Sequence, residues 1–228
     1  MEESAPNPDV VSKPAAILDV DGTLVDTNYH HALAWYRAFH DCGVLVPLWR
    51  LHRHVGMGGD KFVSAVAGQA AEEQLGDEVR GRWEELFNEL LPEVAPTPGA
   101  RELVIALKQR GNRVLFATSA IGAHFDVFLD EKLDARRFAD GWVTKDDADA
   151  SKPDSDLIEA ALAQIDGGPA VMVGDTPWDC TAAHRAGIKT ICLLTGGFSE
   201  AELTAAGAIA VYESPHDLCE RLAETPLA

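Results

Sequence analysis

The stretch AAILDVDGTLVDT, residues 15–27, decides the fold and carries the first candidate functional side chains. Residues 15–18 and Val20 are apolar and typical of a buried strand, and Asp19 and Asp21 lie two residues apart where that strand ends. Residues i and i+2 of a strand lie on the same side, so both carboxylates are expected together at its carboxyl end. In open α/β sheets this is the edge at which ligands bind.

Two neighbouring carboxylates create an electrostatic conflict. Like charges at such a distance repel, so without a cation one pKa would rise or the segment would open locally. A divalent cation resolves the conflict, and hard oxygen ligands favour Mg²⁺. The alternative is a strand end followed by an ordinary turn, because Asp and Gly are common turn residues.

The composition predicts a globular protein with an acidic surface. The chain has 228 residues, 46% of them hydrophobic, which suits one domain with a modest insertion. Its net charge of −18 argues against nucleic acid and anionic membranes as partners, because phosphate groups are bound through Lys and Arg. No apolar run approaches the roughly 20 residues of a membrane helix. Four widely spaced cysteines without a C-x-x-C pair predict reduced thiols and a cytoplasmic location.

The order of helical and strand-like patterns predicts an α/β fold, a Rossmann-like parallel sheet core with an inserted all-α cap. Residues 1–14 are expected to form a disordered lead-in, and residues 28–94 show only helical and turn patterns, including helices over 60–71 and 78–91. After the proline-rich segment 95–99, helices alternate with apolar strands over 113–118, 141–144, 170–173, 189–194 and, at an edge, 209–211. This alternation is typical of a parallel sheet with right-handed crossovers. The predicted core is therefore residues 15–27 and 95–228, with the cap over 28–94.

Three further polar motifs follow predicted segments of the core. Thr118 and Ser119 end the strand VLFA, where hydroxyls near a helix start can bind phosphate, although they could equally cap the helix. Lys152 could supply a fixed cation beside a carboxylate and a phosphate, or be an ordinary solvated lysine. Asp175 and Asp179 follow the strand AVMV, and their alternative roles are a turn residue and a helix N-cap.

The four motifs together resemble those of the haloacid dehalogenase-like hydrolase superfamily. DVDGTLVDT resembles the first motif, the hydroxyl residues after VLFA the second, SKPDSD the third and GDTPWD the fourth. The third departs from the usual pattern, with Ser151 in place of Gly and Ser155 in place of Pro, which affects only the expected turn geometry. The resemblance spans residues 15–194 and implies the same arrangement of core and cap.

The resemblance also implies roles for the motif residues. Asp19 would be the nucleophile that forms an aspartyl phosphate, and Asp21 would be the acid and then the base. The phosphate would be bound by Thr118, Ser119 and Lys152. Mg²⁺ would be held by the Asp19 carboxylate, the Asp21 backbone carbonyl and Asp175, with Asp179 in a supporting or water-mediated position.

A basic patch in the predicted cap suggests how the substrate is recognised. Residues 50–61 contain five basic side chains and the glycine-rich run GMGG, and from them Arg53 and Lys61 are candidates for substrate binding. The chain resembles the branch of phosphoglycolate phosphatases and β-phosphoglucomutase-like phosphatases, in which His31 falls at a conspicuous hinge histidine. A basic cap favours a small anionic leaving group such as that of phosphoglycolate. The alternative is a solvated helix face with a simple hinge.

These observations predict a Mg²⁺-dependent phosphatase that acts on a small phosphorylated metabolite, phosphoglycolate-like or sugar-phosphate-like, as a monomer or homodimer. The first alternative is a β-phosphoglucomutase-like phosphosugar mutase, but Gly174 replaces the acid that mutases carry before the metal-binding Asp. The second is a non-catalytic binding protein of the same fold, which would be expected to have lost one of the acids or Lys152. Asp21 argues against dehalogenase or phosphonatase chemistry, because those members lack an acid there.

Overall fold

The computed structural model describes residues 13–148, 150–166 and 168–228. Most of the predicted lead-in, residues 1–12, therefore lies outside the described residues. Among the residues described, no helix is both long and apolar enough to cross a membrane. All four cysteines are free, and the thiols of Cys180 and Cys192 lie 3.3 Å apart in the interior.

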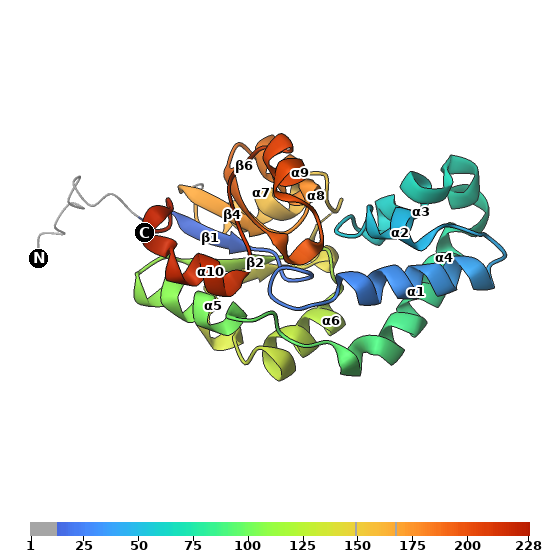
Figure 1. Cartoon of the computed structure of the whole chain (residues 1–228), viewed down its shortest axis with the longest axis horizontal. Helices are drawn as coiled ribbons and strands as arrows, with labels where there is room; N and C mark the ends of the chain where they lie inside the picture. The colour runs from blue at the N-terminus through green and yellow to red at the C-terminus, as the bar shows by residue number, and fades with distance from the viewer. Residues whose placement is uncertain (1–12, 149, 167) are drawn as a thin grey trace, which may run out of the picture.

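Six parallel strands form one sheet in the order β3-β2-β1-β4-β5-β6, which confirms the predicted Rossmann-like core (Figure 1). The strands are β1 (Ala15–Leu18), β2 (Val114–Ala117), β3 (Gly141–Val143), β4 (Ala170–Gly174), β5 (Lys189–Leu193) and β6 (Ala208–Tyr212). At the centre, Leu18 of β1 is in register with Phe116 of β2 and Val173 of β4. The order therefore brings the chain segments that follow β1, β2 and β4 to neighbouring positions on one edge.

Alternating side chains of the central strands form two apolar layers. Leu18 and Phe116 pack in a large core with α5 (Ala100–Gln109), α6 (Gly122–Asp126) and α10 (Pro215–Glu220), whereas Ile17 packs in a second core with α7 (Asp156–Ala163) and α8 (Pro177–Arg185). The short helix α9 (Glu200–Ala205) covers Cys180 and Cys192. Burial on both faces explains why these strands are continuous apolar runs.

Four helices follow β1 before the chain returns to the core through α5: α1 (Asn28–Asp41), α2 (Leu48–His52), α3 (Gly59–Ala67) and α4 (Gln69–Leu90). They lie together beyond the carboxyl end of the strands, on the right in Figure 1. The predicted helix over 60–71 is wrong at its end, because Gly68 adopts a φ of +90° and breaks the helix there. The next helix starts at Gln69 rather than residue 78 and continues through Gly76 and Gly81.

Two helices of the core have distinctive ends. The helix α6 is one turn of α-helix that continues as a π-helix over Val127–Lys132. The helix α8 begins at Pro177, because Thr176 caps it and proline suits the first helical position. Asp179 therefore lies in the first turn of α8 and forms a capping box with Thr176.

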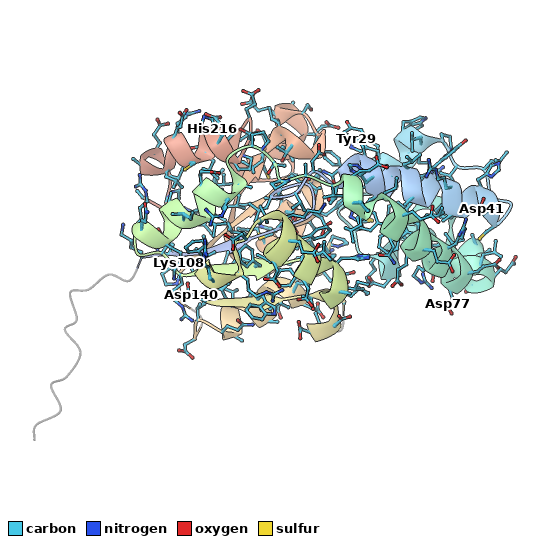
Figure 2. All side chains as sticks on the ribbon, turned by 90° about the horizontal axis from the view of Figure 1, so that it is seen from below. Tyr29, Asp41, Asp77, Lys108, Asp140 and His216 are labelled. Carbon is cyan, nitrogen blue, oxygen red and sulfur yellow. The ribbon has the colours of Figure 1, made fainter. Side chains whose placement is uncertain are left out.

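Polar contacts at the opposite end of the molecule fix the edge of the sheet. Asp140 accepts hydrogen bonds from the Lys108 ammonium (2.7 Å) and the Val114 backbone N–H (2.7 Å). Figure 2 shows Lys108 and Asp140 side by side, far from the helical segment that carries Asp41 and Asp77. Gly99, which returns the chain to the core, has a φ of +80° and contacts the backbone of His216 on α10.

Replacing Gly99 tests this close approach. A Cβ at this position would lie 2.4 Å from the His216 Cα, whereas a Cβ at Gly111, with a similar φ of +88°, would meet nothing within 4 Å. Gly111→Ala should lower the free energy of unfolding by about 1 kcal/mol through backbone strain alone. Gly99→Ala should lower it by about 2–4 kcal/mol, because strain and a collision add. Urea unfolding of both variants checks this, and equal losses would contradict it.

Candidate active site

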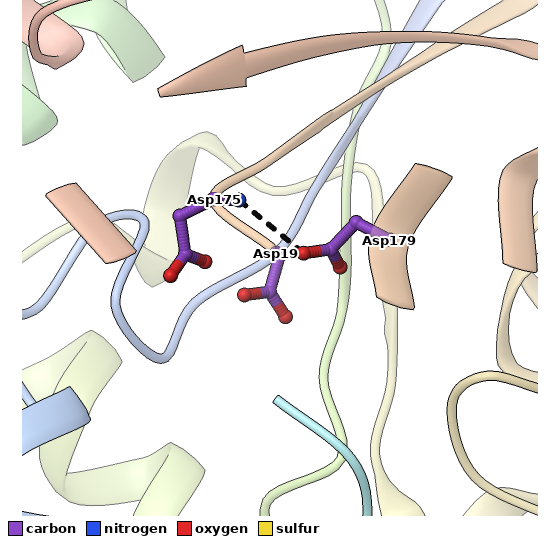
Figure 3. Close-up of side chains that lie close together, drawn as sticks. All are labelled: Asp19, Asp175 and Asp179. Carbon is purple, nitrogen blue, oxygen red and sulfur yellow. Dashed lines mark hydrogen bonds between the residues drawn. The ribbon is translucent and has the colours of Figure 1, made fainter. Parts of the chain in front are cut away.

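Three buried carboxylates from two distant parts of the chain meet at the carboxyl edge of the sheet. Asp19 follows β1, Asp175 follows β4 and Asp179 lies on α8, and one oxygen of each lies within 4.8 Å of the others. Figure 3 shows the three carboxylates grouped together, with the hydrogen bond from the Asp175 N–H to Asp179 dashed. This arrangement could hold a metal ion, since clustered carboxylate oxygens are the ligands of hard cations.

Lys152 is the cation of the cluster. Its side chain is only 2% exposed, and its ammonium contacts Asp19 Oδ1 and lies 2.7 Å from Asp179 Oδ1. The segment around Lys152 thus joins the segments after β1 and β4. One ammonium cannot neutralise three buried carboxylates, so negative charge remains that a bound cation would offset.

The pKa values of two carboxyls reflect this excess of negative charge. Burial raises the pKa of Asp19 to about 7, against the lowering effect of the Lys152 ammonium, and the carboxylates of Asp179 and Asp21 add to the rise. Burial, together with the charges of Asp179 and Asp19, also raises the pKa of Asp175 well above its usual range. Both groups therefore hold protons more tightly than ordinary aspartates unless a cation is bound.

Two residues that the sequence analysis did not single out position Asp175. The Thr23 hydroxyl donates to Asp175 Oδ1 (2.7 Å) and the Asn28 amide donates to Oδ2 (2.8 Å). Gly22 has a φ of +78°, and a Cβ there would lie 2.1 Å from Asn28 Nδ2 and 2.3 Å from Asp175 Oδ2. Gly22, Thr23 and Asn28 follow Asp19 and Asp21 closely in the sequence, and this proximity is the signal that could have identified them.

Asp179 organises the loop after β4 through its other oxygen. Asp179 Oδ2 accepts hydrogen bonds from the backbone N–H groups of Asp175 (3.2 Å) and Thr176 (3.0 Å) and from the Thr176 hydroxyl (2.7 Å). With Oδ1 near Lys152, a single carboxylate links the loop, the helix and the cation. The position of Lys152 and that of Asp175 therefore depend on the same side chain.

Asp21 lies apart from the three-carboxylate cluster in a different environment. Its carboxylate lies 2.9 Å from His31 Nε2 and accepts a hydrogen bond from the Thr118 hydroxyl (3.1 Å). Burial acts to raise the pKa of Asp21, but the hydrogen bonds from His31 and Thr118 and the charge of His31 lower it below the usual value. Asp19 and Asp21 are thus two neighbouring carboxyls whose pKa values are shifted in opposite directions by their different surroundings.

A cavity lies between the sheet edge and the helical segment. From the core it is lined by Asp19, Asp21, Ser119, Ala120, His124 and Lys152. From the helical segment it is lined by His31, Trp35, Trp83 and residues 55–59. The sequence analysis identified the acids, Ser119, His31 and Lys152 but missed the aromatic residues and His124, because their spacing is equally that of ordinary helix cores.

The structure does not bring Arg53 and Lys61 to this cavity. Arg53 pairs with Glu202 and its guanidinium lies 4.0 Å over the Phe198 ring, whereas Lys61 pairs with Asp154 at 3.0 Å. Both contacts join the helical segment to the core outside the cavity.

Two glycines of the same segment, which lines the cavity, also allow close packing against the core. A Cβ at Gly56 would lie 2.7 Å from the Thr176 side chain, and one at Gly58 would lie 1.7 Å from the Ser151 hydroxyl.

Comparisons with known proteins show the family to which the chain is related. A sequence profile of the haloacid dehalogenase-like hydrolases matches residues 13–187. The chain is 28% identical over 200 residues to a validoxylamine A 7'-phosphate phosphatase from Streptomyces hygroscopicus subsp. limoneus, covering 82% of this chain and 88% of that protein. It is also 28% identical over 204 residues to a phosphoglycolate phosphatase from Caulobacter vibrioides, covering 86% and 85%. The crystal structure of a hydrolase from Pseudomonas syringae superimposes with a TM-score of 0.85 at 32% identity, covering 92% of this chain and 98% of that one.

Proton-linked cation binding gives a test of the cluster. The raised pKa values of Asp19 and Asp175 mean that the folded protein keeps protons which the unfolded chain loses between pH 4 and 7, so ionising the empty cluster costs stability as the pH rises. Mg²⁺ relieves that cost, and the increase in the urea unfolding midpoint that it produces should be larger at pH 7.5 than at pH 5.

Unfolding midpoints are compared with and without Mg²⁺ at the same pH. The contributions of titrating groups that do not respond to the ion are then equal in both measurements and cancel. Asp175→Asn should abolish most of the increase, whereas Asp77→Asn, on an exposed surface, should retain it. An equal increase at both pH values, or a full increase in Asp175→Asn, would contradict the assignment.

Proposed function

The chain belongs to the haloacid dehalogenase-like hydrolase family and is a hydrolytic enzyme, and we propose that it hydrolyses a small phosphate monoester through an aspartyl phosphate at Asp19, with Mg²⁺ as cofactor. The observation that carries the proposal is the convergence of Lys152 with the carboxylates of Asp19, Asp175 and Asp179 in one buried cluster. Phosphatases among the relatives support the same reaction class.

The residues of the cluster fit a Mg²⁺ ion. Its ligands would be the Asp19 and Asp175 carboxylates and the Asp21 backbone carbonyl, with Asp179 contributing through water or through its contact with Lys152. A bound Mg²⁺ supplies positive charge that shields the phosphoryl oxygens from the nucleophile and stabilises the charge that develops in the transition state. Thr23 and Asn28 would keep Asp175 in place as a ligand, since both donate to its carboxylate.

In the first half of the reaction, a carboxylate oxygen of Asp19 attacks phosphorus and the bond from phosphorus to the alcohol oxygen breaks. Lys152 and Ser119 hold phosphoryl oxygens, and Thr118 fixes Asp21 through its hydroxyl. Asp21 gives the departing alkoxide the proton that it took from water in the second half of the preceding turnover, so that a neutral alcohol leaves. The Lys152 ammonium meanwhile keeps Asp19 oriented and available as a nucleophile.

In the second half, the ionised Asp21 takes a proton from water, and that water attacks phosphorus. The bond between phosphorus and the Asp19 oxygen breaks, inorganic phosphate leaves and Asp19 is regenerated. The hydrogen bond from His31, which lowers the pKa of Asp21, favours the ionised form needed for this step. General acid–base help of this kind contributes about 10²–10⁴-fold to the rate.

We further propose that residues 28–94 act as a cap on the core, formed by residues 15–27 and 95–228. Asp60 of α3 contacts the Ser151 hydroxyl and the Lys145 ammonium (3.0 Å), and His52 Nε2 lies 3.0 Å from the Gly196 carbonyl oxygen. These contacts hold the helices over the carboxylates. Their closure would exclude water from the aspartyl phosphate until the alcohol has left.

A phosphosugar mutase is less consistent with the loop after β4. The acid that mutases carry before the metal-binding Asp would have to stand at Gly174, but a Cβ there would lie 2.4 Å from the Asp179 carboxyl carbon. An acidic side chain at that position would displace Asp179 and, with it, Lys152. Hydrolysis is therefore the favoured outcome.

Substitution of Asp21 separates binding from turnover. Asp21→Ala should lower kcat for phosphate monoester hydrolysis about 10²–10⁴-fold, because proton transfer is lost while the phosphate contacts remain. Inhibition by inorganic phosphate should change by only a few-fold. Steady-state kinetics with phosphate as a competitive inhibitor measures both quantities, and normal turnover in Asp21→Ala would rule out the assigned role.

A further inference from the structure

The helical segment contributes a wall of aromatic side chains to the cavity, which includes Trp35 and Trp83. The rings of Trp35 and Trp83 are stacked with centroids 4.8 Å apart, and Trp35 stacks in turn on Phe62 at 4.3 Å. Trp83 also stacks on Phe87 at 5.8 Å, and Phe87 on His31 at 3.9 Å. Because each ring is held by its neighbours, the parts of Trp35 and Trp83 that reach the cavity form a rigid apolar lining, against which the C–H groups of a sugar or other polyol can pack.

None of the described residues that line the cavity offers a free positive charge. Among the residues described, its lining includes one lysine or arginine, Lys152, which already pairs with Asp19 and Asp179. Arg53 and Lys61 pair with acids elsewhere.

The remaining basic groups nearby are also unable to serve as counter-charges. Arg80 pairs with Glu72 and Asp77 at 2.8 Å. The imidazole of His31, which also lines the cavity, already contacts Asp21 at 2.9 Å, and burial lowers the pKa of the other lining histidine, His124. A carboxylate on the leaving group would therefore face Asp19 and Asp21 without a counter-charge, which disfavours it strongly in a partly desolvated site.

One hydrogen-bond donor in the wall has no partner within the protein. The indole N–H of Trp83 is buried and makes no hydrogen bond, and it can only donate. A buried donor without an acceptor is costly, so a ligand that supplies an acceptor there gains the interaction at little cost. The hydroxyl of Ser119, also in the lining, is likewise buried without a partner.

From these observations we infer that the substrate is the phosphate monoester of an uncharged, sugar-like alcohol, whose C–H groups pack against the cavity lining of Trp35 and Trp83 and whose hydroxyl oxygen accepts a hydrogen bond from Trp83 Nε1. The inference rests on the proposed phosphatase function and assigns Trp83 as a specificity-determining residue. It replaces the expectation from the sequence of an anionic leaving group bound by Arg53 and Lys61, since neither side chain lines the cavity.

Matched substrate pairs test the charge of the leaving group on the unmodified protein. Glycerol 3-phosphate carries a CH₂OH group where 3-phosphoglycerate carries a carboxylate. Glucose 1-phosphate differs from glucuronic acid 1-phosphate in the same way. We expect kcat/KM to favour the neutral member of each pair at least about tenfold, because only the acid brings an unpaired charge into the site. Preference for the acids would overturn this inference and leave the phosphatase function standing. Failure to hydrolyse any monoester in Mg²⁺ would overturn both.

Removal of the indole N–H tests the role of Trp83. Trp83→Phe keeps an aromatic ring and should lower kcat/KM for the neutral substrates about three- to tenfold, mainly through KM, with little effect on the acids. Trp49→Phe makes the same change at a residue that is 70% exposed and outside the lining, and should leave all substrates unaffected. A Trp83→Phe variant that folds normally by circular dichroism and keeps the KM of the unmodified protein would overturn the assignment.

Introducing a positively charged side chain into the cavity provides an independent test. Met57 lies in the lining, and Met57→Lys should raise kcat/KM for 3-phosphoglycerate relative to glycerol 3-phosphate about tenfold, by supplying the counter-charge that the cavity lacks. An unchanged ratio in the folded variant would show that charge does not govern the choice of leaving group and would overturn the inference.

Discussion

The ion pairing of Lys152 with Asp19 and Asp179 is the interaction on which the rest of the site depends. Removing these groups from water is expensive, and breaking one partner of such a pair typically costs about 3–5 kcal/mol because the other charge is left buried. The parallel sheet makes the arrangement possible, because it brings the ends of β1 and β4 to adjacent positions. The capping box of α8 then fixes Asp179 relative to both. The cluster remains negatively charged, and a divalent cation would offset this excess.

The helical segment completes the site by packing closely against the loops of the core. Gly56 and Gly58 allow the backbone of this segment to approach Thr176 and Ser151, where any side chain would collide. The charged residues at the contact, such as Asp60 with Lys145, pair across it and leave the interior of the cavity to aromatic side chains. Charge is thus concentrated at the phosphate end of the cavity. The end that would receive the leaving group is apolar, with single polar atoms that can distinguish one alcohol from another.

The fold and the polar end of the site could be predicted from sequence because they depend on local patterns. Buried parallel strands are apolar runs, and carboxylates directly after such runs, as with Asp19 and Asp175, must lie at one edge of the sheet. The orientation of cap side chains could not be predicted in this way. Arg53 and Lys61 are close to the cavity in sequence, but acids on the core, Glu202 and Asp154, draw them away from it.

The break between α3 and α4 was predicted after residue 71 but lies at Gly68, because a glycine within a helical pattern can either be tolerated or end the helix. Gly68 ends α3, whereas Gly76 and Gly81 lie inside α4, and only tertiary packing distinguishes them. The aromatic wall escaped notice for a related reason. Trp35 and Trp83 have the spacing of core residues, and their second role as a cavity lining appears only when the helices are placed over the sheet.

The location of a bound divalent cation tests the central claim most directly. Crystals of the unmodified protein soaked in Mn²⁺, an anomalous scatterer that can replace Mg²⁺, would reveal the ion without reference to activity. The account predicts a single strong anomalous peak within coordination distance of carboxylate oxygens of both Asp19 and Asp175, with the Lys152 ammonium still in contact with Asp19. A peak that touches neither carboxylate, or no peak at saturating Mn²⁺, would contradict it.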